Sequence, residues 1–188
     1  SYFGDLRTLH SYFGDLRTLL RLPQPDLPAG CNVAIGHVLA AVVSGRSVTL
    51  YSQTGHKGQR FKGLLRDFYP WSLEPGNIIK PEDGAKVIYD LIRNPLAHDL
   101  GLDLVNKRKG QKIVLKRILP GASETLIAQL EASGPRLEIF KESPTVTIQP
   151  GRTEVRVEPF YWGVCRIIEG LSRDSSRMQS AESFLSTI

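Results

Sequence analysis

An arginine and a histidine with four residues between them are the pair in this chain best suited to chemistry. They are Arg93 and His98, within the stretch LIRNPLAHD at positions 91–99. The guanidinium keeps its positive charge at physiological pH. The imidazole titrates near neutral pH and can exchange a proton. The pair therefore suits chemistry on an anionic substrate.

A helix is predicted to position this pair. Pro81 suits the first turn of a helix, and the two acids that follow it face the positive end of the helix dipole. Apolar residues then recur at helical spacing, at Val87, Ile88, Leu91 and Ile92. On an ideal helix, Arg93 and His98 would lie about 140° apart. We therefore expect Pro95 to bend or interrupt the helix between them.

The remaining chain is typical of a mainly α fold. Helical spacing of apolar residues predicts further helices over 32–44, 59–69 and 159–172. The stretch 47–51 is a candidate for extended chain. The stretch 137–157 alternates as strands do, and Pro150-Gly151 predicts a turn within it. We expect one domain over 1–188: a helical bundle with β-hairpin insertions, mainly α and α+β overall.

The N-terminus carries a tandem duplication. SYFGDLRTLH is followed at once by SYFGDLRTLL, so two decapeptides differ only at their last position. A period of ten residues is too short for a solenoid repeat. One helix with a single apolar seam is predicted within 1–22, from Tyr2, Leu6, Leu9, Phe13, Leu16 and Leu20. The seam can pack on its own bundle or on a second subunit. A coding duplication or cloning scar that only lengthened a helix is the alternative.

A strongly basic β-hairpin is predicted over 103–119. Leu104-Val105 and Ile113-Val114-Leu115 flank a turn at Lys109-Gly110. Its basic residues are Lys107, Arg108, Lys109, Lys112, Lys116 and Arg117, opposed only by Asp103. Such a run can be a solvated surface, or it can contact phosphate if the charges gather on one face.

Composition narrows the class of protein. The net charge of +5 favours an anionic partner such as nucleic acid. Cys31 and Cys165 form no CxxC pair, which suits reduced thiols, and no spacing predicts a metal site or a cofactor.

The most apolar run, 33–43, is short and is broken by Gly36 and His37, so we expect no membrane span. With no signal peptide pattern, a cytoplasmic protein is expected. His37, within the predicted helix 32–44, is expected to be buried in the core of the fold.

The stretch Arg93-Asn94-Pro95-Leu96-Ala97-His98, late in an amphipathic helix, resembles the motif of the HEPN superfamily, whose members are small helical bundles. The resemblance covers the predicted helices, roughly a third of the chain. Toxins of this superfamily that are silenced by nucleotide transfer carry a tyrosine two residues after the histidine. Leu100 stands at that position here. That mode of control is therefore not predicted.

The resemblance implies a metal-independent endoribonuclease of the toxin or defence type, acting as a homodimer, with an antitoxin or another regulatory protein as a further partner. His98 would be the general acid or base, Arg93 would hold the scissile phosphate, and Asn94 would orient one of them. The attacking group would be the 2′-hydroxyl of the RNA. The basic hairpin would guide the RNA backbone.

Noncatalytic alternatives remain. Arg93 and His98 can instead cap helix carbonyls or pair with Asp90 and Asp99. The chain would then be a HEPN-like module that binds RNA or nucleotides, or a dimerisation protein that engages a partner through the N-terminal seam.

Overall fold

The computed structural model describes residues 12–16, 18–19, 31–51, 55–74, 79–95, 105–106, 111–116 and 143–173. The helical elements are α2 (Asn32–Leu50), α3 (Lys57–Phe68), η1 (Trp71–Leu73), α4 (Pro81–Ile88), η3 (Tyr89–Arg93) and α8 (Val157–Arg173). The strands are β1 (Val105–Asn106), β2 (Gln111–Lys116), β3 (Val146–Gln149) and β4 (Arg152–Arg156). The predicted mainly α fold with a smaller β part is confirmed.

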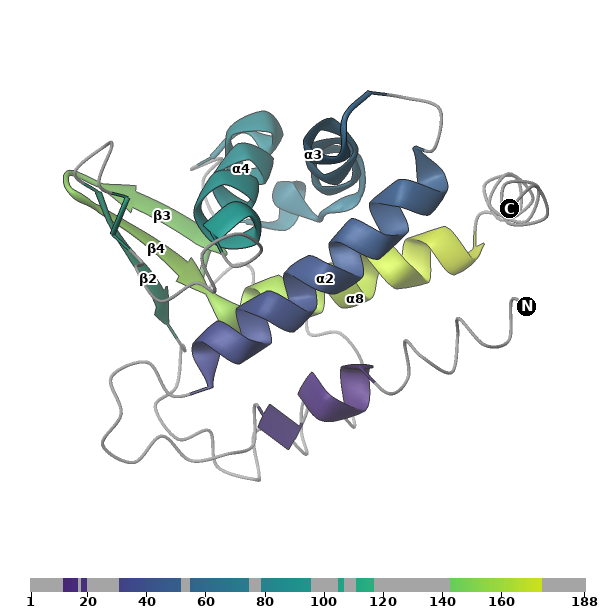
Figure 1. Cartoon of the computed structure of the whole chain (residues 1–188), viewed down its shortest axis with the longest axis horizontal. Helices are drawn as coiled ribbons and strands as arrows, with labels where there is room; N and C mark the ends of the chain where they lie inside the picture. The colour runs from purple at the N-terminus through teal and green to yellow at the C-terminus, as the bar shows by residue number, and fades with distance from the viewer. Residues whose placement is uncertain are drawn as a thin grey trace.

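Helix α2 is the central element of this arrangement. It packs against α3, η3, α8 and β2, and Figure 1 shows α8 running alongside it with the sheet near its N-terminal end. Gly36 is a point of close approach. A Cβ atom there would lie 3.3 Å from Leu115 Cδ1 and 3.7 Å from Ile92 Cγ2. Strand β2 and the helix that carries Arg93 therefore meet α2 at the same glycine.

The length of α2 bears on the question of a membrane. It has 19 residues with a mean hydropathy of 1.5 over an 18-residue window, enough in length and composition to cross a bilayer. The argument that the apolar run is too short is therefore wrong, because the helix continues past Val43 to Leu50. Of that window, 39% is buried inside the fold. In this fold α2 packs against α3, α8 and β2, and one helix of such length and composition is weak evidence for a membrane span.

The two predicted β regions join in a single sheet. Its strand order is β1-β2-β4-β3, with antiparallel pairs β1–β2 and β3–β4 and a parallel pair β2–β4 at the centre. Gly151, at φ 72°, makes the tight turn between β3 and β4, where the sequence predicted one. The predicted strand at 137–140 lies outside the described residues.

Residues 12–16 and 18–19, near the N-terminus, are described as helical. Leu16 is fully buried, and the ring of Phe13 meets Tyr161 of α8 edge to face, with centroids 5.9 Å apart. These two seam residues thus pack on the chain's own bundle. The rest of the predicted seam lies outside the described residues.

A buried polar cluster fastens the loop after α3 to β3 and α8. We call Tyr69, Glu74 and Thr145 the Glu74 cluster. The Tyr69 hydroxyl is hydrogen-bonded to the Thr145 hydroxyl and donates to the carbonyl of Pro159 at 3.1 Å. Glu74 Oε1 accepts from the Thr145 amide at 3.0 Å, whereas Oε2 has no partner among the described residues. Burial raises the pKa of Glu74 and, together with the nearby Glu74 charge, that of Tyr69.

Two local predictions are wrong. The stretch 47–51 is not extended, since α2 runs through it to Leu50. Inside the helix, Ser47 Oγ donates to the Ser44 carbonyl at 2.8 Å and Thr49 Oγ1 to the Gly45 carbonyl at 3.3 Å. Their polar groups are therefore satisfied without leaving helical geometry. His37 is exposed rather than in the core, because the buried face of α2 follows Ile35, Leu39 and Val43 instead.

Candidate functional site

The predicted helix before the motif is present but changes geometry as it approaches Arg93. Pro81 occupies its first turn, with acids beside it, as predicted. Gly84 lets the indole of Trp71 lie against α4, and Trp71 Nε1 donates to the Leu65 carbonyl at 2.8 Å. These contacts fix α4 against α3. Tyr89 to Arg93 then form a π-helical turn, in which the Asn94 amide donates to the Tyr89 carbonyl.

The departure from α geometry begins before Pro95, one turn earlier than predicted. Proline has no amide hydrogen for the carbonyl four residues back, and its ring crowds that carbonyl. A wider turn just before the proline relieves this crowding. Single π-helical turns inside α-helices are rare and are frequent at functional sites. The path from residue 96 to His98 lies outside the described residues.

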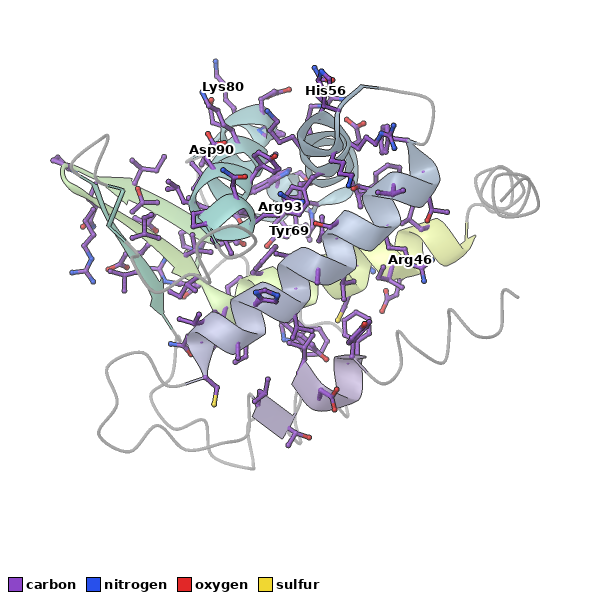
Figure 2. The ribbon with its side chains drawn as sticks, viewed as in Figure 1. Arg46, His56, Tyr69, Lys80, Asp90 and Arg93 are labelled. Carbon is purple, nitrogen blue, oxygen red and sulfur yellow. The ribbon has the colours of Figure 1, made fainter. Side chains whose placement is uncertain are left out.

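Arg93 lies over an aromatic ring together with a second cation. The Arg93 Cζ atom is 5.6 Å from the centroid of the Tyr89 ring, and Lys62 Nζ of α3 is 5.4 Å from the same centroid. We call Lys62, Tyr89 and Arg93 the Tyr89 cluster. All three side chains are half-buried. Figure 2 labels Arg93 on the part of the helix that lies between the bodies of α4 and α2.

Residues of α3 also contact the Tyr89 ring and fix its position. Its hydroxyl lies against Gly58, where a Cβ atom would come within 2.5 Å of it, so a larger residue would displace the ring. The Phe61 ring packs on Tyr89 with centroids 5.6 Å apart. Because Phe61 belongs to the buried core, the platform under Arg93 is tied to the core of the fold.

Neither cation of the Tyr89 cluster is neutralised within the described part of the chain. Arg93 and Lys62 form no ion pair with a described carboxylate. Asp90, three residues before Arg93, is therefore not its partner, which removes one of the structural alternatives for the arginine. Two cations that converge on one ring repel each other, so an anion near both would be stabilised. A phosphate is the anion that arginine and lysine commonly bind.

The predicted catalytic residues are described in part. Arg93 stands at the end of the π-helical turn, and Asn94, the next residue, is exposed. His98 lies outside the described residues, so its position relative to Arg93 is untested. Among the described residues, no group of three or more His, Cys, Asp or Glu side chains gathers as metal ligands do.

The basic hairpin is also described in part. Strands β1 and β2 pair as predicted, with Val105 opposite Lys112. Lys112 and Lys116 lie in β2, while Lys107, Arg108, Lys109 and Arg117 lie outside the described residues.

Sequence reasoning missed Tyr89 and Lys62. The sequence does contain a signal for Tyr89, which precedes Arg93 by four residues on the same helix, a spacing at which side chains meet. It contains no such signal for Lys62, because Lys62 belongs to α3 and reaches the ring only through helix packing. Comparison with known proteins does not assign the site, since no family profile, no curated protein and no solved structure matches the chain.

Proposed function

We propose that this protein is a metal-independent endoribonuclease that cleaves RNA through attack of its own 2′-hydroxyl. In that reaction the 2′-oxygen forms a bond to phosphorus while the bond from phosphorus to the 5′-oxygen breaks. The 2′-hydroxyl loses its proton to a base, and the leaving 5′-oxygen gains one. The products carry a 2′,3′-cyclic phosphate and a 5′-hydroxyl. His98 moves one of these protons, and Arg93 binds the phosphate, with Asn94 as a positioning residue.

The observation that carries this proposal is the guanidinium of Arg93 above Tyr89, which has no counterion among the described residues and lies five residues before a histidine. Transfer of a phosphoryl group places negative charge on the phosphate oxygens, and fixed cations stabilise that charge. Lys62 supplies a second cation at the same ring, which adds to the binding of the RNA phosphate. Because the RNA brings its own nucleophile, the protein needs only these cations and a proton carrier.

Cleavage of single-stranded RNA in EDTA tests the proposal. The wild-type chain is expected to cleave, and Arg93→Ala and His98→Ala are each expected to abolish cleavage while unfolding within a few degrees of the wild-type temperature. Arg166→Ala is the matched control, because Arg166 is a partly exposed arginine of α8 paired only with Glu169 among the described residues. Equal cleavage by the wild type and His98→Ala would refute the proposal.

A noncatalytic RNA-binding module is the second candidate. One observation favours it: Arg93 and Lys62, two cations that can bind phosphate, lie over one ring, and binding alone needs no proton carrier. This candidate predicts salt-sensitive RNA binding without any cleavage in the same assay.

The proposal includes a homodimer in the cytoplasm, in which the motifs of two subunits meet, with RNA as substrate and an antitoxin or regulatory protein as a further partner. Mixing Arg93→Ala with His98→Ala protein tests the shared site. If each site takes residues from both copies, the mixture regains part of the cleavage that each variant lacks.

A further inference from the structure

The two faces of the sheet differ in chemistry. One face of the sheet, the inner face, carries Ile113 and Leu115 in β2, Thr153 and Val155 in β4, and Val146 in β3, all of them buried. Glu154, between Thr153 and Val155, is buried as well. This inner face packs toward the helices, as the contact of Leu115 with Gly36 of α2 shows. Because successive residues of a strand alternate between faces, the positions between them form a second, outer face.

The outer face collects basic positions from two segments far apart in the sequence. The parallel pairing sets Lys112 beside Arg152 and Lys116 beside Arg156. Glu154, beside Val114, is the acidic position between them. In this register four basic positions stand against one acidic position. Figure 1 shows β2 and β4 side by side at the end of the molecule away from α8's C-terminus.

Glu154 forms an ion pair with each of the two arginines, but its single negative charge does not neutralise both. Arg152 Nη2 lies 2.6 Å from Glu154 Oε1, and Arg156 Nη2 lies 3.6 Å from Glu154 Oε2. Arg156 also donates to the Pro144 carbonyl at 2.9 Å and to Thr147 Oγ1 at 2.7 Å, so it belongs to the fold. Arg152 uses one nitrogen for Glu154 and keeps 45% of its side chain exposed. Within the part of the chain that the structure describes, no further partner takes its remaining donors.

We infer that the outer face of the sheet, centred on Arg152 and the positions of Lys112 and Lys116, binds the phosphate backbone of single-stranded RNA. The positions of Lys112 and Lys116 are about 13 Å apart at 3.3 Å per residue, so the face is long enough to meet more than one phosphate of a strand. The described positions of this face hold no aromatic residue on which a base would stack. Binding is therefore through the backbone and is tolerant of sequence.

A membrane surface is less well matched to this face. Interfacial binding combines basic residues with apolar side chains that enter the lipid. Val114, half-buried, is the one apolar residue among the outer positions of β2, β3 and β4 that the structure describes. The choice of RNA rests on the proposed function, although the binding itself requires no cleavage.

Binding of a fluorescent single-stranded 2′-O-methyl RNA to the full chain, measured over a range of salt concentrations, tests the inference. This RNA has no free 2′-hydroxyl, so the result does not depend on whether the protein is a nuclease. Arg152→Gln is expected to weaken binding about fourfold at 0.15 M salt and to lower the slope of log affinity against log salt by about 0.7, the effect of one phosphate contact on a single strand. Arg152→Lys keeps the charge and is expected to restore the slope.

Arg166→Gln is the matched control, since it removes the same charge from a partly exposed arginine of α8 that also pairs with a carboxylate. It is expected to bind as the wild type does. The inference is overturned if Arg152→Gln and Arg166→Gln, both folded by thermal unfolding, give the same affinity and slope. Equally tight binding to phosphatidylserine vesicles, weakened to the same extent by Arg152→Gln, would overturn the choice of RNA in favour of a membrane.

Discussion

The Glu74 cluster and the Tyr89 cluster are both built around a tyrosine, but their polar groups are used differently. Tyr69 is buried and its hydroxyl is hydrogen-bonded to Thr145 and to the Pro159 carbonyl. Tyr89 is half-buried and carries two cations with no described counterion. The interactions of the Glu74 cluster join η1, β3 and α8. The Tyr89 cluster leaves charge available to a ligand.

This contrast separates what stabilises the fold from what acts on a substrate. Substitutions in the Glu74 cluster should change stability and leave the activity of each folded molecule unchanged. Substitutions in the Tyr89 cluster should do the reverse, since a cation over an aromatic ring contributes only about 0.5–1 kcal/mol at a partly exposed site.

The largest expected effect is the loss of RNA cleavage caused by the substitution Arg93→Ala. Loss of one group that stabilises transition-state charge lowers kcat by about 100- to 1000-fold. The free energy of unfolding should fall by no more than about 1 kcal/mol, because among the described residues the contact of the side chain is with Tyr89. Single-turnover cleavage and urea unfolding measure the two quantities. A loss of stability that matches the loss of activity would erase the distinction between the clusters.

Gly163→Ala should act only on stability. Gly163 lies in α8 directly against the ring of Tyr69, and a Cβ atom there would overlap that ring. Overpacking of this kind lowers the free energy of unfolding by about 1–3 kcal/mol. Gly170→Ala, in the same helix, is the matched control because a Cβ atom there would meet nothing within 4 Å. It should stabilise by up to about 1 kcal/mol through helix propensity. Equal effects of the two substitutions in urea unfolding would contradict the packing of Tyr69.

Glu74→Gln should change how stability depends on pH. Burial raises the pKa of Glu74 in the folded state, while its hydrogen bonds with Thr145 and the charge of Arg156 oppose the shift. A raised pKa means that the folded state holds the proton more tightly than the unfolded state. The wild type therefore loses stability as the pH rises from the unfolded pKa, about 4.3, through the folded one.

Glutamine carries no charge, so Glu74→Gln lacks this loss. Relative to the wild type it should become more stable as the pH rises through that window, by on the order of 1 kcal/mol, the scale of a buried polar group without a hydrogen bond. Urea unfolding of both proteins at a series of pH values measures the difference. A difference that is constant with pH would show that Glu74 is ionised equally in both states.

Lys62→Gln should have the smallest effect, because its cation lies on the neighbouring helix α3 and serves as a second charge near the phosphate. We expect KM for RNA to rise severalfold, on the scale of one phosphate contact, with kcat nearly unchanged. Lys86→Gln, an exposed lysine of α4, is the control. A fall in kcat as large as that of Arg93→Ala would place Lys62 in the reaction itself.

The sequence predicts the helices of this fold well because their signals are local. The apolar spacing in 59–69 and 159–172 predicted α3 and α8 within a few residues. The end of α2 was missed, since Ser47 and Thr49 look like loop residues until their bonds to the helix backbone are known. The parallel pairing of β2 with β4 joins residues about 40 positions apart, and no local pattern encodes it.

The candidate site was predictable only as a pair of residue types. Arg93 was found from its spacing to His98. The π-helical turn was not, because it depends both on Pro95 and on the packing of Tyr89 against α3. Lys62 reaches the ring from α3, so only the fold brings it there. The same is true of Arg152, which the sheet sets beside Lys112.

The chemical identity of the RNA ends tests the central claim most directly. Single-stranded RNA is incubated with the wild-type chain in EDTA, and the products are separated and their termini determined by mass spectrometry. The account predicts 2′,3′-cyclic phosphate and 5′-hydroxyl ends, which are absent with Arg93→Ala and with His98→Ala. Products that end in a 3′-hydroxyl and a 5′-phosphate, or no products at all, would contradict it.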